Sequence, residues 1–303
     1  METLESLQRR ITSANDLFGI IRTMKVLAAA SIRQFEQAVE AVGIYSNTIE
    51  TGFRFALWEQ PLRSETPLQK SGGTLAVIFG TDQGMCGQFN ENILSFALND
   101  LENLQNRKII VGQRAASKLE ETGVPFESLF HLPSSVEAIN PAVQSLLLRI
   151  NTLRESDGLE KVVLYYNRPV SLSAYQPVRV QLLPIDLNPF RTPVKTKDAS
   201  RSLPMYSMDR ERLLSRLISQ YLFVQVYRAY AESLASENTS RLVTMQVAEK
   251  NIQERLYELN TQYHNLRQDS ITSEMLDIVS GVEALGEQNL FFSEEEKSIW
   301  NVR

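Results

Sequence analysis

The sequence has 303 residues, of which 43% are hydrophobic and 22% charged, and its formal net charge is −5. This composition is that of a globular protein, and the acidic balance argues against nucleic-acid binding, which needs a basic patch. A single cysteine, Cys86, excludes an internal disulfide, and two histidines are too few for a typical Cys/His zinc site. No apolar run approaches the ~20 residues that cross a bilayer, so we expect membrane association only through partners.

Helix-breaking residues are concentrated in the middle of the chain. All eleven prolines lie between Pro61 and Pro204, whereas residues 208–280 contain neither glycine nor proline. Both flanks therefore permit long helices. We predict four segments: an N-terminal coiled-coil helix at 1–60, an α/β domain of Rossmann-like type at 70–200, a C-terminal coiled-coil helix at 207–285 and an extension at 286–303.

Both flanks carry an apolar stripe with steps of three or four residues. In the first flank the stripe runs from Leu4 to Ile49, and in the last it continues beyond Met245 to Leu266. Such a stripe over many turns is typical of a coiled-coil seam. Since the two flanks are the ends of one chain, we expect them to pair as antiparallel helices. A polar interruption falls at residues 237–241.

The middle of the chain reads as strands that alternate with helices, which predicts a small, mostly parallel sheet with helices on its faces. The fold class is therefore α/β with a long helical coiled coil. Strand patterns lie at 75–79, 108–111, 161–166 and 178–183, and helix patterns lie at 90–104, 115–121 and 141–153.

The loop GTDQGMCGQFN, residues 80–90, lies where open α/β sheets often bind ligands. Its glycine spacing matches neither G-x-G-x-x-G nor a Walker loop. Tight packing of the turn, with Asp82 or Asn90 as a helix cap, is the favoured interpretation. A nucleotide- or Cys86-dependent α/β enzyme stays open as an alternative, as does a coiled-coil scaffold that homodimerises.

Several segments together resemble one family, the γ subunits of F-type ATP synthases. They are MKVLAAA at 24–30, TDQGMCGQFN at 81–90, ASENTSRLVTMQVAEKN at 235–251 and YHNLRQDSITSEMLDIVSG at 263–281. These motifs occur in the family's order over nearly the whole chain up to Leu285. Departures such as His264, Ser31 and Gln83 indicate a divergent bacterial member.

The resemblance implies a central-stalk rotor subunit that does no bond chemistry and holds no cofactor or metal. The implied partners are a hexamer of α and β subunits, the ε subunit and the membrane c-ring, with H⁺ or Na⁺ as the coupling ion. The expected location is peripheral, on the cytoplasmic face of the bacterial inner membrane or of the thylakoid membrane. The residues implied to contact partners are Met24, Lys25, Arg241, Met245, Arg267, Gln268, Thr272 and Glu274.

The family commonly ends near Leu285, whereas this chain continues to Arg303. Ser293 and Glu296 have the spacing of a capping box, which predicts a separate short helix there. We expect this extension to anchor or brake the shaft at the top of the hexamer.

Overall fold

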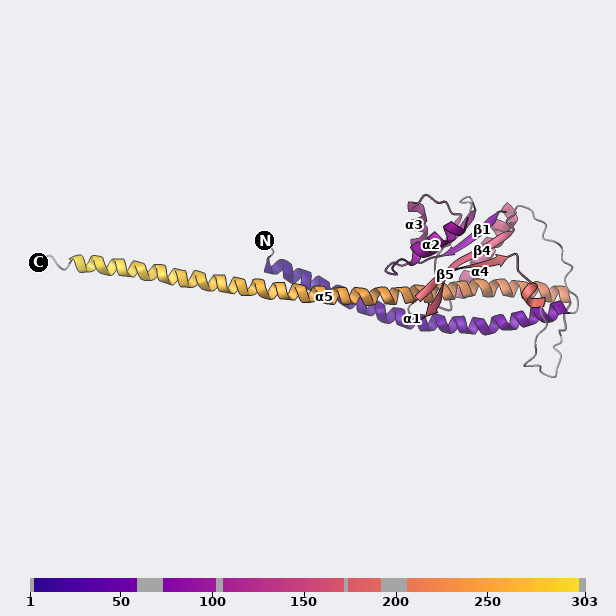
Figure 1. The fold of residues 1–303 in the computed structure, drawn as a ribbon, viewed down its shortest axis with the longest axis horizontal. Helices are drawn as coiled ribbons and strands as arrows, with labels where there is room; N and C mark the ends of the chain where they lie inside the picture. Colours follow the sequence, from indigo (N-terminus) through magenta and orange to yellow (C-terminus); the bar gives the residue numbers. More distant parts are fainter. Residues whose placement is uncertain (1–2, 59–72, 102–105, 172–173, 192–205, 300–303) are drawn as a thin grey trace. The chain divides into compact units, whose positions relative to one another are not determined.

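The computed structural model describes residues 3–58, 73–101, 106–171, 174–191 and 206–299, with side chains described as far as Val282. Two long helices, one at each end of the chain, flank the smaller elements in sequence (Figure 1). In chain order the elements are α1 (Leu4–Trp58), β1 (Thr74–Phe79), α2 (Phe89–Asp100), β2 (Arg107–Val111), α3 (Gln113–Glu121), β3 (Ser128–Phe130), α4 (Ile139–Asp157), β4 (Lys161–Ser171), β5 (Ala174–Leu183), the 3₁₀ turn η1 (Asn188–Arg191) and α5 (Arg210–Ile299).

The strands form one five-stranded sheet in the order β3-β2-β1-β4-β5. The first four strands are parallel, and β5 pairs antiparallel with β4. In the central strand Val77 lies opposite Ile109 on one side and Leu164 on the other. The mostly parallel sheet is thus confirmed. Strand β3 was not predicted, because its three half-buried residues are too short for a recognisable pattern.

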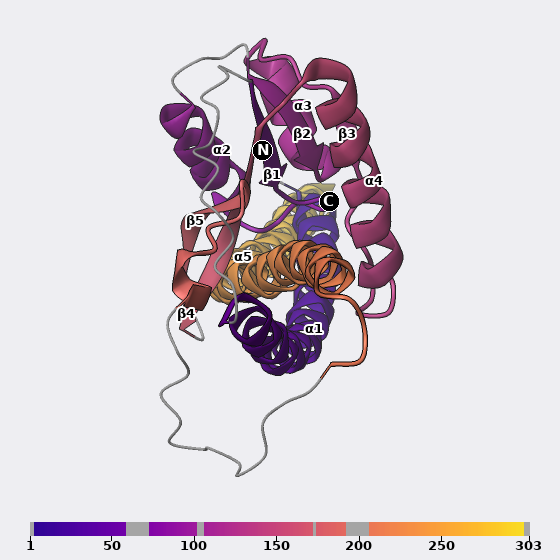
Figure 2. The ribbon, with the colours of Figure 1, turned by 90° about the vertical axis from the view of Figure 1, so that its right-hand side faces the viewer.

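Helices cover both faces of the sheet, and α2 and α4 lie on opposite sides of it in Figure 2. Ala76 and Ile78 of β1 face α2 and α3, whereas Leu75, Val77 and Phe79 face α4 and α5. This alternation follows from the two-residue period of a strand. A strand buried on both faces has a nearly continuous apolar sequence, as β1 has from Leu75 to Phe79.

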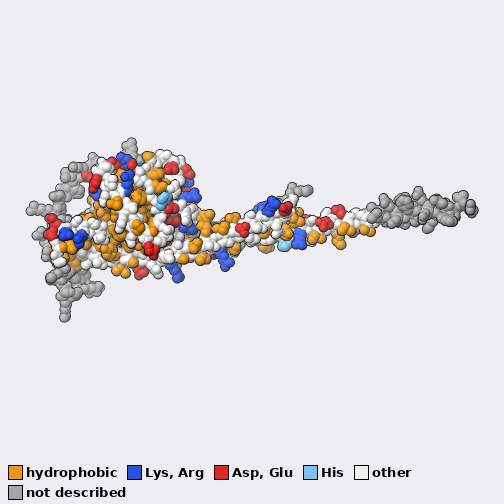
Figure 3. All heavy atoms as spheres, turned by 180° about the vertical axis from the view of Figure 1, so that it is seen from behind, with side chains coloured by type: hydrophobic (Ala, Val, Ile, Leu, Met, Phe, Trp, Pro, Cys, Tyr) orange, Lys and Arg blue, Asp and Glu red, His pale blue; other side chains and the backbone are white. Residues whose placement is uncertain are grey.

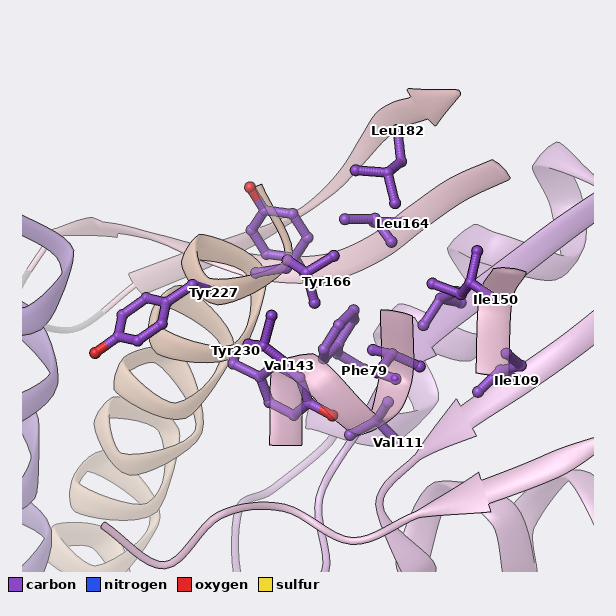
Figure 4. Packing of buried hydrophobic residues seen from close by; sticks show 14 of the residues in the cluster. Phe79, Ile109, Val111, Val143, Ile150, Leu164, Tyr166, Leu182, Tyr227 and Tyr230 are labelled. Atoms are coloured by element: carbon purple, nitrogen blue, oxygen red, sulfur yellow. The ribbon is translucent and has the colours of Figure 1, made fainter. Parts of the chain in front are cut away.

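Helix α5 contributes aromatic rings to the core on the second face (Figure 4). Tyr230 packs edge-to-face on Phe79, with ring centroids 4.9 Å apart, and Phe79 also meets Tyr166 at 6.3 Å. Edge-to-face pairs add about 0.5–1.5 kcal/mol beyond the area that they bury. The long helix is therefore part of the core of the α/β domain as well as half of a helix pair.

The chain divides into two compact units, residues 24–246 and residues 1–23 with 247–303. In the first unit α1 and α5 are antiparallel, since Gly52 approaches Leu217 while the Tyr45 hydroxyl lies 3.0 Å from Oε1 of Gln220. Ile49, Phe53 and Leu57 of α1 pack there with Leu214 and Val224 of α5.

In the second unit the buried and half-buried positions follow heptad spacing. Leu7 and Leu259 are almost fully buried, at 1% and 2% exposed. The predicted apolar stripe is thereby confirmed on both helices. Its half-buried members are Leu4, Ile11, Ala14, Phe18 and Ile21 on α1, with Ile252, Leu256, Tyr263, Leu266 and Ser270 on α5.

Helix α5 runs without interruption from Arg210 to Ile299, so the prediction of a separate helix that opens at Ser293 is wrong. A capping-box spacing starts a helix only where the preceding residue leaves helical geometry, and nothing before Ser293 breaks the helix. A single glycine such as Gly286 costs a helix only about 1 kcal/mol, and no proline lies in this stretch. Among the described residues no helix is long and apolar enough to span a membrane.

Candidate functional site

Four of the predicted contact residues lie in the exposed part of α5. Arg267, Gln268, Thr272 and Glu274 all face solvent. The Thr272 hydroxyl donates to the carbonyl oxygen of Gln268 at 2.8 Å, an ordinary bond within a helix. The side chains of Arg267, Gln268 and Glu274 are therefore presented outward and available to a partner.

Large apolar side chains share this stretch of α5. Ile278 is 68% exposed, and apolar side chains stand out along the described part of the helix in Figure 3. A soluble protein that exposes contiguous apolar side chains usually presents an interaction surface. We call this stretch, residues 267–282, the exposed segment. Its large exposed apolar residues are Ile271, Met275, Leu276, Ile278, Val279 and Val282.

The other predicted contact residues lie elsewhere and are less accessible. Met245 is 3% exposed, whereas Met24 and Lys25 are half-buried. Met24 lines a cavity of about 670 Å³ beside the loop 82–87. The eight predicted residues thus divide between exposed and buried environments.

Arg241 is 7% exposed and is bound within the chain. Its Nη1 donates to Oδ1 of Asn238 at 3.0 Å, and its Nη2 forms a short ion pair with Glu237. Burial raises the pKa of the Glu237 carboxyl, and the Arg241 guanidinium opposes that shift. Removal of either member of such a pair would leave a buried charge without its partner.

The loop 80–90 is held together by its own side chains. The Thr81 N–H donates to Oδ1 of Asn90 at 3.0 Å, and Nδ2 of Asn90 donates to the Thr81 hydroxyl at 2.9 Å. The Asp82 carboxylate accepts from the backbone N–H of Gln113 at 2.7 Å and from that of Leu132 at 2.8 Å. Asp82 therefore binds the first N–H of α3, and Asn90 secures the loop. The helix that follows the loop, α2, has no side-chain cap, so the expected capping of that helix by Asp82 or Asn90 is wrong.

Two glycines of this loop are required by close approaches. A Cβ at Gly80 would lie 2.3 Å from the Cβ of Ala115. Gly87 has φ +59°, and a Cβ there would lie 3.2 Å from Oγ1 of Thr244. The glycines thus serve packing, the first against α3 and the second against α5.

Helix α5 is bonded to the α/β domain through side chains at intervals of four residues. Ser236 donates to the carbonyl oxygen of Asn167 at 3.0 Å, and Ser240 donates to that of Cys86 at 2.6 Å. One turn earlier, Oε2 of Glu232 accepts from Nε of Arg168 at 2.8 Å. We call Glu232, Ser236, Ser240 and Thr244 the polar ladder.

The first three members of the ladder, Glu232, Ser236 and Ser240, lie in a stretch of α5 where every residue from Ala231 to Arg241 is buried, and Thr244 follows it as a half-buried residue. We call residues 231–241 the enclosed segment. A helix that is buried on all sides belongs to the interior of a domain. The polar interruption at residues 237–241 is therefore part of the stretch of α5 that the α/β domain and α1 together enclose.

Cys86 fits a structural thiol better than a nucleophile. It is 2% exposed, and burial raises the pKa of its thiol. A catalytic cysteine needs a lowered pKa and access to substrate. Among the described residues no group of three or more His, Cys, Asp or Glu side chains could hold a metal ion.

Comparison with known proteins agrees with this architecture. The model of the family described as ATP synthase matches residues 3–285. This chain belongs to that family. It is 28% identical to the ATP synthase gamma chain of Desulfitobacterium hafniense over 94% of this chain and 100% of the relative, and 29% identical to that of Nostoc sp. with the same coverage.

Solved structures show the same fold. A chain of the Euglena gracilis mitochondrial ATP synthase in rotational state 3 is 18% identical, with a TM-score of 0.63 over 94% of this chain and 95% of that one. A central-stalk chain of the Tetrahymena thermophila enzyme gives 0.56 at 23% identity, over 76% of this chain and 99% of that chain. The predicted gamma subunit and its fold class are confirmed, and neither the scaffold nor the enzyme alternative is favoured.

The polar ladder was missed by the sequence reasoning, although Ser236 and Ser240 lie inside a motif used for the family resemblance. The available signal was hydroxyl residues four apart in a glycine-free helix, since positions i and i+4 share one face. Their acceptors are backbone carbonyls of residues that are distant in sequence, which no pattern in the chain announces.

Proposed function

We propose that this chain is the central-stalk rotor subunit of an F-type ATP synthase, coupling ion flow through a membrane ring to ATP synthesis or hydrolysis on a hexamer of α and β subunits. The observation that carries the proposal is the family match over residues 3–285. As a rotor, the chain transmits torque and performs no bond chemistry. Its partners are the hexamer, the ε subunit and the c-ring, and it is peripheral to the membrane.

The exposed segment is the part of the chain best suited to contact the hexamer. Arg267 supplies a planar fork of donors for a carboxylate or backbone carbonyls, and Gln268 supplies an amide. Thr272 and Glu274 lie on the following turns among exposed apolar side chains. Of the predicted contact residues these four are exposed and can bind a partner directly. The other four, Met24, Lys25, Arg241 and Met245, are half-buried or buried among residues 24–246.

The proposal also includes the side of the membrane on which the chain lies. Gamma chains of several bacteria are similar to this chain over their whole length. A bacterial rotor of this family would lie on the cytoplasmic face of the inner membrane, or of the thylakoid membrane in a photosynthetic bacterium.

The extension at 286–303 lies beyond the residues that the family model matches. Since α5 continues as helix to Ile299, the extension prolongs the shaft. We propose that it anchors or brakes the shaft at the top of the hexamer. Deletion of residues 286–303 should then change the rate of ATP hydrolysis or the torque of single rotating complexes, and unchanged values for both would remove this role.

The partner contact is tested by Arg267→Ala and Gln268→Ala in the purified complex. Loss of a charge-assisted hydrogen bond is worth about 1.5–3 kcal/mol, so Arg267→Ala should lower coupled ATP hydrolysis about tenfold or more. Arg255→Ala is the matched control, since Arg255 is half exposed on the same helix and pairs only with Glu258 among the described residues. Normal activity of both test variants, or absence of this chain from complexes that contain the α and β subunits, would contradict the proposal.

A further inference from the structure

The α/β domain is joined to α5 by two kinds of contact. The first is apolar: Val226, Tyr230 and Leu234 of α5 pack on the sheet in the larger core cluster. Apolar contact stabilises by burying area and has no preferred direction. The second is the polar ladder, whose hydrogen bonds weaken steeply when donor and acceptor are misaligned. The packed side chains of the core resist rotation of the helix about its own axis through steric contact, and the second kind of contact adds resistance that depends on direction.

The ladder joins three consecutive turns of α5 to fixed partners, of which Arg168 donates to the helix while the carbonyl oxygens of Asn167 and Cys86 accept from it. Asn167 and Arg168 lie near the end of β4, and Cys86 lies in the loop after β1. Both supports are rigid. Strand β4 pairs with β1 and β5, and the loop is secured by Thr81, Asp82 and Asn90.

A link across the supports strengthens the joint. Nδ2 of Asn167 donates to the carbonyl oxygen of Phe89 at 3.4 Å, which ties the end of β4 to the start of α2. The Arg168 guanidinium is itself held by the Tyr166 hydroxyl at 2.8 Å from Nη2. Asn167 and Arg168, the partners of the ladder on β4, are therefore each held by a further hydrogen bond of their own side chain.

The last position of the ladder is steric. Thr244 bonds its own helix, donating to the carbonyl oxygen of Ser240 at 2.8 Å, and its Oγ1 lies 3.2 Å from the position that a Cβ at Gly87 would take. Small and hydroxyl side chains bring the backbone of the loop against the helix. Any turn of α5 would break the ladder's bonds and bring new side chains against Gly87.

We propose that the polar ladder is the positioning device that fixes the rotational register of α5 within the α/β domain, so that torque passes between them without slip. This rests on the proposed function, in which the hexamer acts on α5 and the ring acts through the α/β domain. Glu232, Ser236 and Ser240 are positioning residues, because each acts by holding α5 against the α/β domain. The apolar core provides stability, and the ladder provides the angular lock.

The test uses the complete complex in vesicles, with ATP hydrolysis and ATP-driven ion pumping measured on the same sample. The variant is Glu232→Gln/Ser236→Ala/Ser240→Ala. The matched control is Ser233→Ala, since Ser233 is equally buried on the same helix and its hydroxyl has no partner among the described residues.

We expect the triple variant to hydrolyse ATP within twofold of the wild type when an ionophore removes the gradient. Against an established gradient it should pump at least threefold fewer ions per ATP, whereas Ser233→Ala should match the wild type in both conditions. A defect that appears only under load identifies slip, since simple destabilisation would lower hydrolysis in both conditions or reduce the amount of assembled complex.

Equal pumping ratios for the triple variant and the wild type would overturn the ladder's role and leave the proposed function intact. A complex that lacks this chain and still pumps as well as the wild-type complex would instead overturn the proposed function. Ser240→Ala removes one oxygen atom and no charge, and it decides the question if the triple variant does not assemble. It should then show about twofold fewer ions pumped per ATP at the highest gradient, and no reduction there would reject the proposal.

Discussion

Two stretches of the same helix have opposite environments. In the enclosed segment, residues 231–241, every side chain is buried, although the segment includes Glu232, Glu237 and Arg241. In the exposed segment, residues 267–282, apolar side chains such as Ile278 and Met275 face solvent. Charged side chains are thus buried in the first segment and apolar side chains exposed in the second, the opposite of what is usual in a globular protein. This indicates that the first segment serves contacts within the chain and the second serves contacts with partners.

The largest effect should follow from breaking the buried ion pair. Arg241→Leu leaves the Glu237 carboxylate buried without its partner and should lower the free energy of unfolding by about 3–5 kcal/mol. Urea unfolding of the purified chain measures it. The paired replacement Glu237→Leu/Arg241→Leu is the control and should lie much closer to the wild type, and an equal loss in both would show that the pair itself matters little.

A smaller effect should come from the coiled-coil seam. Leu259→Ala removes a side chain that is 2% exposed and should cost about 2 kcal/mol, at the low end for a buried leucine because a two-helix seam can relax. Hydrogen exchange of the amides of residues 252–266 measures the loss locally. Tyr257, 76% exposed on the same helix, supplies the control Tyr257→Ala, and equal exchange in the two variants would refute a packed seam.

At alkaline pH the ionisation of Tyr230 should change the free energy of unfolding by about 1 kcal/mol. Burial, and secondarily the charge of Asp82, raises the pKa of the Tyr230 hydroxyl. Above the ordinary tyrosine pKa of about 10 the unfolded chain loses this proton while the folded chain keeps it, so stability falls as the pH rises.

Tyr230→Phe should reduce that fall while changing stability little at pH 7, since the hydroxyl has no hydrogen-bond partner among the described residues. Unfolding curves at pH 7 and pH 10.5 measure both quantities. An unchanged alkaline loss would show that Tyr230 ionises normally in the fold.

The smallest effect should be in the exposed segment. Ile278→Ala should change the free energy of unfolding of the purified chain by less than about 0.5 kcal/mol, because its side chain is 68% exposed. Thermal unfolding is sufficient to measure this. A loss above 1 kcal/mol would mean that the chain covers this side chain itself, and the comparison between the two segments would fail.

The sequence predicted the elements that depend on local periodicity. The heptad stripe was correct to the residue at Ile252, Leu256 and Leu259, because the pattern that defines a seam is the pattern that is buried. The loop 80–90 was also interpreted correctly as architecture, since its glycine spacing suits no phosphate-binding motif.

The remaining features depend on tertiary contacts. An amphipathic stripe identifies one buried face of a helix, so it could not show that the α/β domain covers the other faces around Ser236 and Ser240. Arg241 and Met245 were named as contact residues by the family resemblance, which carries no information about their burial in this chain. The capping-box spacing at Ser293 failed because a start signal is ineffective inside a helix that is already formed.

Because the only cysteine of the chain is buried, its reactivity reports whether the loop 80–90 is docked on α5. Cys86 is 2% exposed, and its carbonyl oxygen accepts the Ser240 hydroxyl. A thiol reagent should label the sulfur slowly in the closed state and faster when the loop leaves α5. The labelling rate of Cys86 in a working complex would therefore report how often the loop separates from α5 during turnover, without the introduction of another cysteine.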